Sequence, residues 1–306
     1  MKKSLIALAV AGVVAAPAAF AATGNVDVYG KLRVSLSSID GDWELGDQVS
    51  RIGFKGTEDL GGGLKAVWQI ESGVGGNGMT GGVGTASIAS RNTFVGLAGG
   101  FGTVVMGRHD TPYKMAGSAD LFGDTLADAQ NNGGIIGAGN FDLRVDRALA
   151  YISPDFSGFH VAAAVVPGIA GDNELTDAYS VAAMYKNGPL NASLGYEDHN
   201  NLADEDAWKV NVGYAMGDLK LGATYESQEY AGNDNDNWLV SAAYGMGPIT
   251  LAAQYGDTET NDFKQWTLGM IYAMSKRTSA ALAYSNIDFD GGDDIDAFTV
   301  QLNHDF

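Results

Sequence analysis

Several aspartates lie in one long stretch of the chain, residues 110 to 146, that has neither a helical nor a strand-like hydrophobic period. Among them are Asp110, Asp120, Asp124 and Asp128. Strand-like runs lie on both sides, and a loop of this length inside a compact domain usually has a function. A row of charges in a narrow aqueous passage attracts its counter-ion. We therefore predict that this loop folds inward and narrows a water-filled channel.

Catalysis and metal binding have weaker support in the sequence. His199 lies in the segment EDHNN and His304 on the outer parity of the last strand, and neither has a nucleophile in a recognisable setting. We assign no catalytic residue and expect no enzyme, cofactor or metal site. The stretches GNDNDN (232–237) and DFDGGDD (288–294) have the composition of calcium ligands but lack EF-hand spacing. Solvated loop tips are favoured, with a bound divalent cation as the alternative.

The strands that would surround the loop are clearest in the second half of the chain, where a hairpin recurs about every 30 residues. In each hairpin an aromatic residue opens the first strand, a tyrosine closes it, and another tyrosine ends the return strand. These aromatic residues are Tyr179, Tyr185, Tyr196, Trp208, Tyr214, Tyr225, Trp238, Tyr244, Tyr255, Trp266, Tyr272 and Tyr284. Between the first and last aromatic residue of each strand, their parity carries no charge, whereas the opposite parity is polar.

Two architectures give a strand one apolar and one polar face. A soluble sandwich buries the apolar face as its core, which provides no reason for aromatic residues at both edges in strand after strand. A bilayer provides that reason, because Tyr and Trp favour its two interfaces and a charge at mid-depth costs roughly 2 to 4 kcal/mol. The pattern therefore favours a transmembrane β-barrel with two aromatic girdles.

The number of strands is consistent with a closed barrel. Three strands precede residue 73, two precede the long loop, two follow it, eight form the hairpin repeats, and one spans 295–306. The total of 16 is even, as expected when both chain ends lie on the same side of the membrane. We predict an all-β fold, a 16-stranded antiparallel transmembrane β-barrel with an inward-folded third loop over about 110–146. A barrel of this size encloses a water-filled channel.

The N-terminus indicates export. Lys2 and Lys3 precede an apolar run that ends at Ala21, which predicts a signal peptide over residues 1–21 and a barrel over residues 22–306. An uncleaved membrane anchor is the alternative. Without these two lysines the chain has 16 basic and 37 acidic residues, a net charge of −21. That charge argues against nucleic acid as a partner.

Several motifs carry a resemblance to a known family. They are SRIGFKGTEDLGGGLKAVWQIE (50–71), FGTVVMGR (101–108), DTPYK (110–114), LFGDTLAD (121–128), YISPDFSGF (151–159) and the terminal Phe306. Together they resemble the Gram-negative general porins, especially those of the neisserial and betaproteobacterial type. The likeness runs over the whole mature chain. It implies a homotrimer in the outer membrane, in contact with lipids and lipopolysaccharide, that passes ions and small hydrophilic solutes passively.

The resemblance also assigns roles to residues. In this family the third loop forms the eyelet of the pore, and basic residues of the barrel wall face it. The positions that match this wall are Lys31, Arg33, Arg51 and Arg108. Arg144 matches the family's arginine before the sixth strand, and Arg147 is added to the basic wall as a further candidate. The family usually has Asn where this chain has Arg147, which leaves the sign of the ion selectivity open.

The terminal Phe306 resembles the family's assembly signal. We expect the trimer contact on the first strands, around Leu32, Val34, Ile52 and Phe54, which lack the later aromatic rows. A substrate-specific channel with a solute-binding eyelet is the alternative function. Such channels line their path with aromatic side chains, for which Tyr29 and Tyr151 are the candidates here.

Overall fold

The computed structural model describes residues 26–74, 88–130, 133–168, 175–199 and 205–306. The predicted signal peptide lies outside these residues. The described part contains one short helix, α2 (Pro112–Met115), and the strands β1 (Val26–Ile39), β2 (Asp42–Asp47), β3 (Arg51–Gly61), β4 (Leu64–Gly73), β5 (Thr93–Gly99), β6 (Gly102–Asp110), β7 (Arg144–Ile152), β8 (Phe159–Val166), β9 (Ala178–Asn187), β10 (Leu190–Asp198), β11 (Asp206–Met216), β12 (Leu219–Tyr230), β13 (Asn233–Met246), β14 (Ile249–Thr258), β15 (Phe263–Ala273), β16 (Thr278–Phe289) and β17 (Ile295–Asp305).

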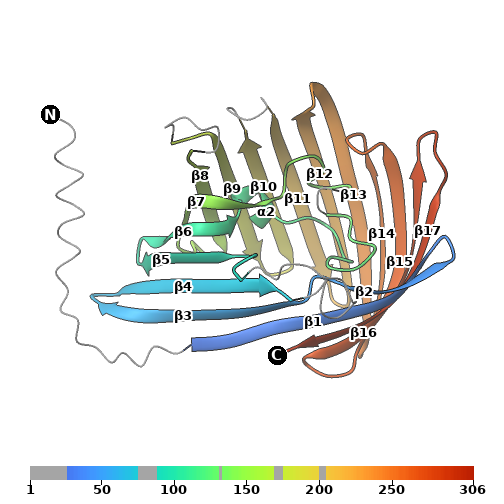
Figure 1. Ribbon diagram of the computed structural model, residues 1–306, viewed down its shortest axis with the longest axis horizontal. Helices are drawn as coiled ribbons and strands as arrows, with labels where there is room; N and C mark the ends of the chain where they lie inside the picture. The colour runs from blue at the N-terminus through green and yellow to red at the C-terminus, as the bar shows by residue number, and fades with distance from the viewer. Residues whose placement is uncertain (1–25, 75–87, 131–132, 169–174, 200–204) are drawn as a thin grey trace.

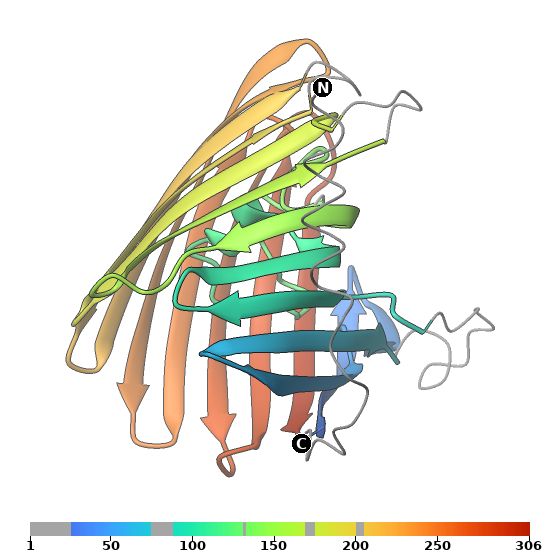
Figure 2. The ribbon, with the colours of Figure 1, turned by 90° about the vertical axis from the view of Figure 1, so that its left-hand side faces the viewer.

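The strands form one antiparallel sheet that closes on itself (Figures 1 and 2). On one side β1 pairs with β17, and on the other it pairs with β3 along its first half and β2 along its second half. β2 and β3 are therefore two halves of one barrel strand, and the described segments make a 16-stranded barrel. The predicted fold class is confirmed.

The seam of the barrel is completed by the last residue of the chain. Phe306 N donates to Gly30 O and Gly30 N donates to Phe306 O, both at 3.1 Å. The phenyl ring lies over Gly30, where a Cβ atom would be 2.3 Å from Phe306 Cζ. Glycine at position 30 is therefore required by the close approach of this ring.

Side chains alternate between the two faces of the wall. On β13, Leu239 points inward and is fully buried, whereas the next residue, Val240, is 44% exposed on the outer face. The aromatic residues of neighbouring strands meet on that outer face. Trp208 with Tyr225, Trp238 with Tyr255 and Trp266 with Tyr284 each have ring centroids 5.4 Å apart. An apolar outer surface is what a bilayer requires of such a wall.

The segment between β6 and β7 enters the barrel, as the green trace in Figures 1 and 2 shows. We call residues 111–143 loop 3. It is shorter than the predicted 110–146, because Asp110 and residues 144–146 extend the β6–β7 ladder. The side chain of Thr111 caps α2 by accepting from Lys114 N. No helix in the described residues is long and apolar enough to cross a membrane.

Loop 3 packs against one side of the barrel interior. Ile135 and Ile136 are fully buried with Leu239 and Phe263, and Phe122 is buried against alanines of β13, β14 and β16. Part of the inner face, whose parity the sequence showed as polar, is therefore covered by apolar side chains of loop 3. Small inner side chains on these strands leave the space that the apolar part of the loop fills.

Candidate functional site: loop 3 and its basic wall

Three cations gather on the inner wall of β1 and β3. Lys31 and Arg33 are two residues apart on β1, on the face opposite the exposed Leu32. Arg51 on β3 is paired with Lys31 in the strand register. Alternation along the two strands thus places all three side chains on one patch, which we call the basic patch.

The loop provides one carboxylate for this patch. Asp124 Oδ2 lies 2.6 Å from Arg33 Nη1 and 3.1 Å from Arg51 Nη1, so both guanidinium groups share a single oxygen. Arg33 also donates to Gly123 O at 3.4 Å. The Asp124 side chain is 28% exposed. Asp305 of β17, which is paired with Lys31 in the strand register, adds a second carboxylate. With Asp124 and Asp305 against three cations, the basic patch keeps an excess of one positive charge.

Asp110 occupies a different place from Asp124. As the last residue of β6, it forms an ion pair with Arg144 Nη2 at 2.9 Å and accepts from Asn92 Nδ2 at 2.8 Å. Arg144 Nε also donates to Asn92 Oδ1 at 2.6 Å. Asp110 and Arg144 directly flank loop 3, and their opposite charges neutralise each other.

The structure corrects the assignment of Arg108 and Arg147. Arg108 Nη1 lies 2.8 Å from Asp146 Oδ1, and Arg147 Nη1 donates to Gly168 O at 2.6 Å, so neither meets the acids of loop 3 in the described residues. A register shift between Gly107 and His109, together with a left-handed Arg147 (φ 59°), re-aims both side chains.

Asp120 and Asp128 are turned back into the loop, which corrects the expected row of four exposed acids. Asp120 Oδ1 accepts from Phe122 N at 3.0 Å, and Asp128 accepts from Asp124 N and Gln130 N, both at 2.8 Å. Burial and the neighbouring Asp120 raise the pKa of Asp128 to about 8, and burial raises the pKa of Asp120. The pair therefore holds at least one proton at neutral pH and braces the backbone around Asp124.

Polar side chains of the opposite wall anchor the loop backbone. Several of them have the inner-face parity that the sequence indicates, but parity alone does not identify them as anchors of the loop. The donor–acceptor pairs are Tyr113 N to Ser180 Oγ (2.8 Å), Ser193 Oγ to Ala116 O (2.6 Å), Ala119 N to Thr224 Oγ1 (2.7 Å), Leu121 N to Gln254 Oε1 (3.0 Å), Gln265 Nε2 to Ala127 O (3.3 Å) and Gln301 Nε2 to Asp124 O (3.3 Å). These contacts run from β9 to β17, so loop 3 follows the wall around most of that arc.

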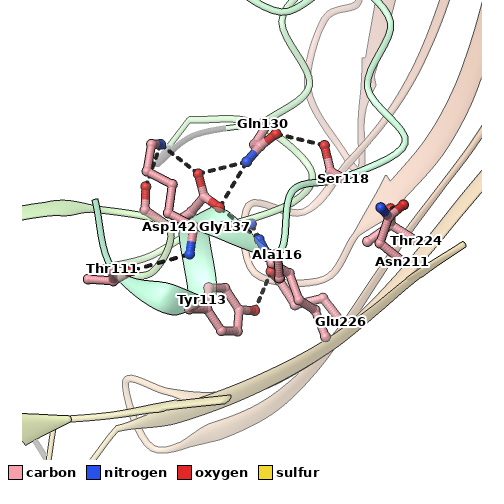
Figure 3. Close-up of polar contacts among 12 residues, drawn as sticks. Thr111, Tyr113, Ala116, Ser118, Gln130, Gly137, Asp142, Asn211, Thr224 and Glu226 are labelled. Carbon is pink, nitrogen blue, oxygen red and sulfur yellow. Dashed lines mark hydrogen bonds and ion pairs between the residues drawn. The ribbon is translucent and has the colours of Figure 1, made fainter. Parts of the chain in front are cut away.

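A buried ion cluster fixes the return of the loop. Asp142 lies 2.7 Å from both Lys209 Nζ of β11 and Lys114 Nζ of α2. It also accepts from Gln130 Nε2 at 2.9 Å (Figure 3). The side chains of Asp142 and Lys209 are fully buried. Burial alone would raise the pKa of Asp142, but the two ammonium groups outweigh it and lower this pKa. The cluster is thus held in its charged form.

Glu226 of β12 is the second buried anchor. It accepts from Tyr113 Oη at 2.5 Å and from Gly137 N at 2.9 Å (Figure 3). Gly137 has a φ of 76°, and a Cβ atom there would lie 2.2 Å from Asp142 Cβ. A charged residue on the inner parity among alanines, serines and amides was the available signal for Glu226 and Lys209.

The remaining residues considered from the sequence lie elsewhere. Tyr29 is on the inner wall and donates to Glu71 Oε2 at 2.9 Å, whereas Tyr151 borders an outer-face hollow with Leu149 and Val181. Residues 233–237 belong to β13 and are not a free loop tip. The described residues contain no group of three or more His, Asp or Glu side chains placed to hold a metal ion.

Comparisons with known proteins agree with this geometry. The chain matches the family model for Gram-negative porins over residues 6–292. It is 34% identical over 210 residues to the major outer membrane protein P.IB of Neisseria gonorrhoeae, covering 61% of this chain and 54% of that protein. It thus spans about half the length of that relative. It is 31% identical over 326 residues to the outer membrane porin protein 32 of Delftia acidovorans, covering 94% and 89%.

Solved structures show the same architecture. An anion-selective porin from Comamonas acidovorans superposes with a TM-score of 0.77 at 25% identity, covering 92% of this chain and all of that one. The outer membrane protein OmpT of Vibrio cholerae, in its trimer form, gives a TM-score of 0.71 at 19% identity over 92% of this chain and 99% of that one. The second likeness concerns the fold alone.

Proposed function

The chain belongs to the Gram-negative porin family and is a β-barrel protein of the outer membrane, and we propose that it forms a water-filled channel for passive diffusion of ions and small hydrophilic solutes. Family membership favours a channel over an enzyme. The eyelet would lie where Asp124 of loop 3 meets the basic patch, because this is where charged side chains from the loop and the wall meet while still partly exposed.

We propose further that the eyelet prefers anions. The observation that carries this is the sharing of one oxygen of Asp124 by Arg33 and Arg51, with Lys31 beside them. Charges more than about 8 to 10 Å from the passage are largely screened at physiological salt, so the local excess of positive charge should outweigh the net charge of the chain. The description of the Comamonas relative as anion-selective supports the same sign.

The reversal potential of single channels in a KCl gradient tests this proposal. We expect the potential of an anion-preferring channel, and a cation preference would contradict the assignment of the eyelet. A substrate-specific channel would instead show saturating block of the current by one solute. A general-diffusion channel would instead pass unrelated small solutes at similar rates that do not saturate with concentration.

The assembly is also a proposal. We infer a homotrimer embedded in outer-membrane lipid and lipopolysaccharide, with its contact on β1 and β3, where Leu32 and Phe54 face outward without aromatic rows. Because a closed barrel leaves no unpaired edge, the oligomer should survive mild detergent and dissociate on heating. Crosslinking that yields only a monomer would contradict it.

Processing and insertion can be tested together. We infer that residues 1–21 are removed, so the N-terminal sequence of the purified protein should begin at Ala22. Phe306 completes the barrel seam, and its deletion should lower the yield of folded protein in the outer membrane. An unchanged yield would remove its proposed role in assembly.

A further inference from the structure

A partly enclosed cavity lies between the roots of loop 3 and the inner wall of β7 to β10. Its volume is about 250 Å³. Leu143 borders it from the loop, and Ala164, Val166 and Ala178 border it from the wall, so most of the lining is apolar. A cavity of this kind is large enough for a small organic molecule and is separate from the basic patch.

One end of the cavity is acidic. Glu197, His199 and Glu205 line it and are all buried. His199 Nε2 lies 3.0 Å from Glu197 Oε1, and His199 Nδ1 lies 4.0 Å from Glu205 Oε2. The ring of Phe141 stacks on His199 with centroids 4.9 Å apart. The sequence had placed His199 in a loop segment and gave no sign of this burial.

The acidic end of the cavity has a carboxylate oxygen that lacks a donor in the described part of the chain. Glu197 Oε2 is buried and has no hydrogen-bond partner within the described residues, although the other oxygen of the same carboxylate meets His199. The described residues that line the cavity include no lysine or arginine. Two carboxyl groups therefore face one imidazole at this end, so acidic groups outnumber basic ones there.

We propose that this cavity binds a small organic ammonium ion, with its amine at Glu197 and its apolar body against Ala164, Val166 and Ala178. A buried carboxylate oxygen without a donor is costly, and a protonated amine supplies both the donor and the compensating charge. The apolar walls remove the body of the ligand from water. This site takes cations and is distinct from the eyelet, so its occupancy does not depend on the ion preference proposed above.

Calorimetry on the purified full-length protein in detergent tests the proposal with three probes of similar shape, benzylammonium, benzyl alcohol and phenylacetate. We expect benzylammonium to bind the most tightly and phenylacetate the least. Glu197→Gln should weaken benzylammonium at least about tenfold, as expected for loss of a charge-assisted contact, while leaving benzyl alcohol unchanged. Glu58→Gln, on the exposed part of β3, is the matched control and should change neither probe.

A variant that changes no charge tests the cavity itself. Ala178→Leu should fill the space and abolish binding of both benzylammonium and benzyl alcohol, with the barrel checked by circular dichroism and heat-dependent dissociation. Unchanged affinity in either Glu197→Gln or Ala178→Leu, or equal binding of benzylammonium and phenylacetate, would overturn the proposal. If Glu197→Gln does not fold, the result for Ala178→Leu decides.

Discussion

Loop 3 contacts the barrel wall on two sides, and the charged side chains are buried and paired on one side but partly exposed on the other. Toward β11 and β12, Lys209, Asp142 and Glu226 are fully buried, and each has polar partners at hydrogen-bond distance. Toward β1 and β3, Arg33 and Arg51 share one carboxylate and stay partly exposed. Buried, compensated charges therefore hold the loop in place, while exposed, uncompensated charges set the field that an ion meets. The number of charges inside a barrel does not by itself reveal selectivity.

The largest expected effect comes from the buried side. Lys209→Met leaves Asp142 with Lys114 as its remaining cationic partner and should cost about 3 kcal/mol, the lower end for breaking a buried ion pair. The unfolding midpoint in denaturant and protease cleavage within 111–143 measure this loss. Lys220→Met on β12, where the lysine is exposed, is the control. Equal stability of the two variants would mean that the cluster does not anchor the loop.

On the exposed side, the double variant Arg33→Gln with Arg51→Gln should lower the anion-to-cation permeability ratio roughly fivefold. In a water-like medium at about 0.1 M salt, each charge about 8 Å from an ion changes the energy of that ion by about 0.25 kcal/mol, with opposite sign for an anion and a cation. Two charges therefore change the free energy behind the permeability ratio by about 1 kcal/mol. The reversal potential reports the change. Arg108→Gln with Arg147→Gln removes the same charge from positions that contact Asp146 and Gly168, so its shift should be much smaller. If this control shifts the reversal potential as much as the first variant does, Arg108 and Arg147 belong to the basic wall of the eyelet, as the sequence predicted.

Removal of the carboxylate that loop 3 provides to the basic patch should act in the other direction. Asp124→Asn frees both guanidinium groups and should raise the anion preference about twofold, by the same estimate for one charge. Neutralising Asp234 and Asp236 on β13 removes two acids and should have less effect, because these side chains lie away from the basic patch. A rise in cation preference on Asp124→Asn would contradict the placement of the eyelet.

The smallest expected effect is a dependence on pH. The pKa of Asp128 is about 8 in the folded loop against an ordinary value of 3.8, so it is protonated below pH 8 and charged above it. This folded-state pKa is raised, so the stability of the loop should fall as pH rises from about 4 to 8. Anion preference should also fall between pH 7 and 9, because the new charge lies beside Asp124. Asp128→Asn should abolish the fall in loop stability and in anion preference that the wild type shows as pH rises. If the variant and the wild type have the same pH profile, Asp128 is not the group responsible.

The barrel was predictable because its signal is periodic. Alternation and paired aromatic residues repeat over many strands, so one ambiguous strand does not change the fold. The pairing of charges inside it follows from single backbone features that carry no such repetition. The register shift near Gly107 turns Arg108 away, and the left-handed Asp124 (φ 58°) brings one carboxylate to two arginines. Parity could place Lys209 on the inner face, but it could not show that Asp142, 67 residues earlier, would meet it.

The contact between Gly30 and Phe306 has a consequence for how the protein is made. The two residues that complete the ring come from opposite ends of the chain, so the cylinder cannot close during synthesis, however much of the sheet has already formed. Until then β1 and β17 each present a row of unpaired backbone groups, which are sites for pairing with other chains. Such late, long-range closure is slow compared with hairpin formation. Safe delivery of an open sheet to the membrane, rather than stability of the finished cylinder, is therefore the step at which this protein is most exposed to aggregation.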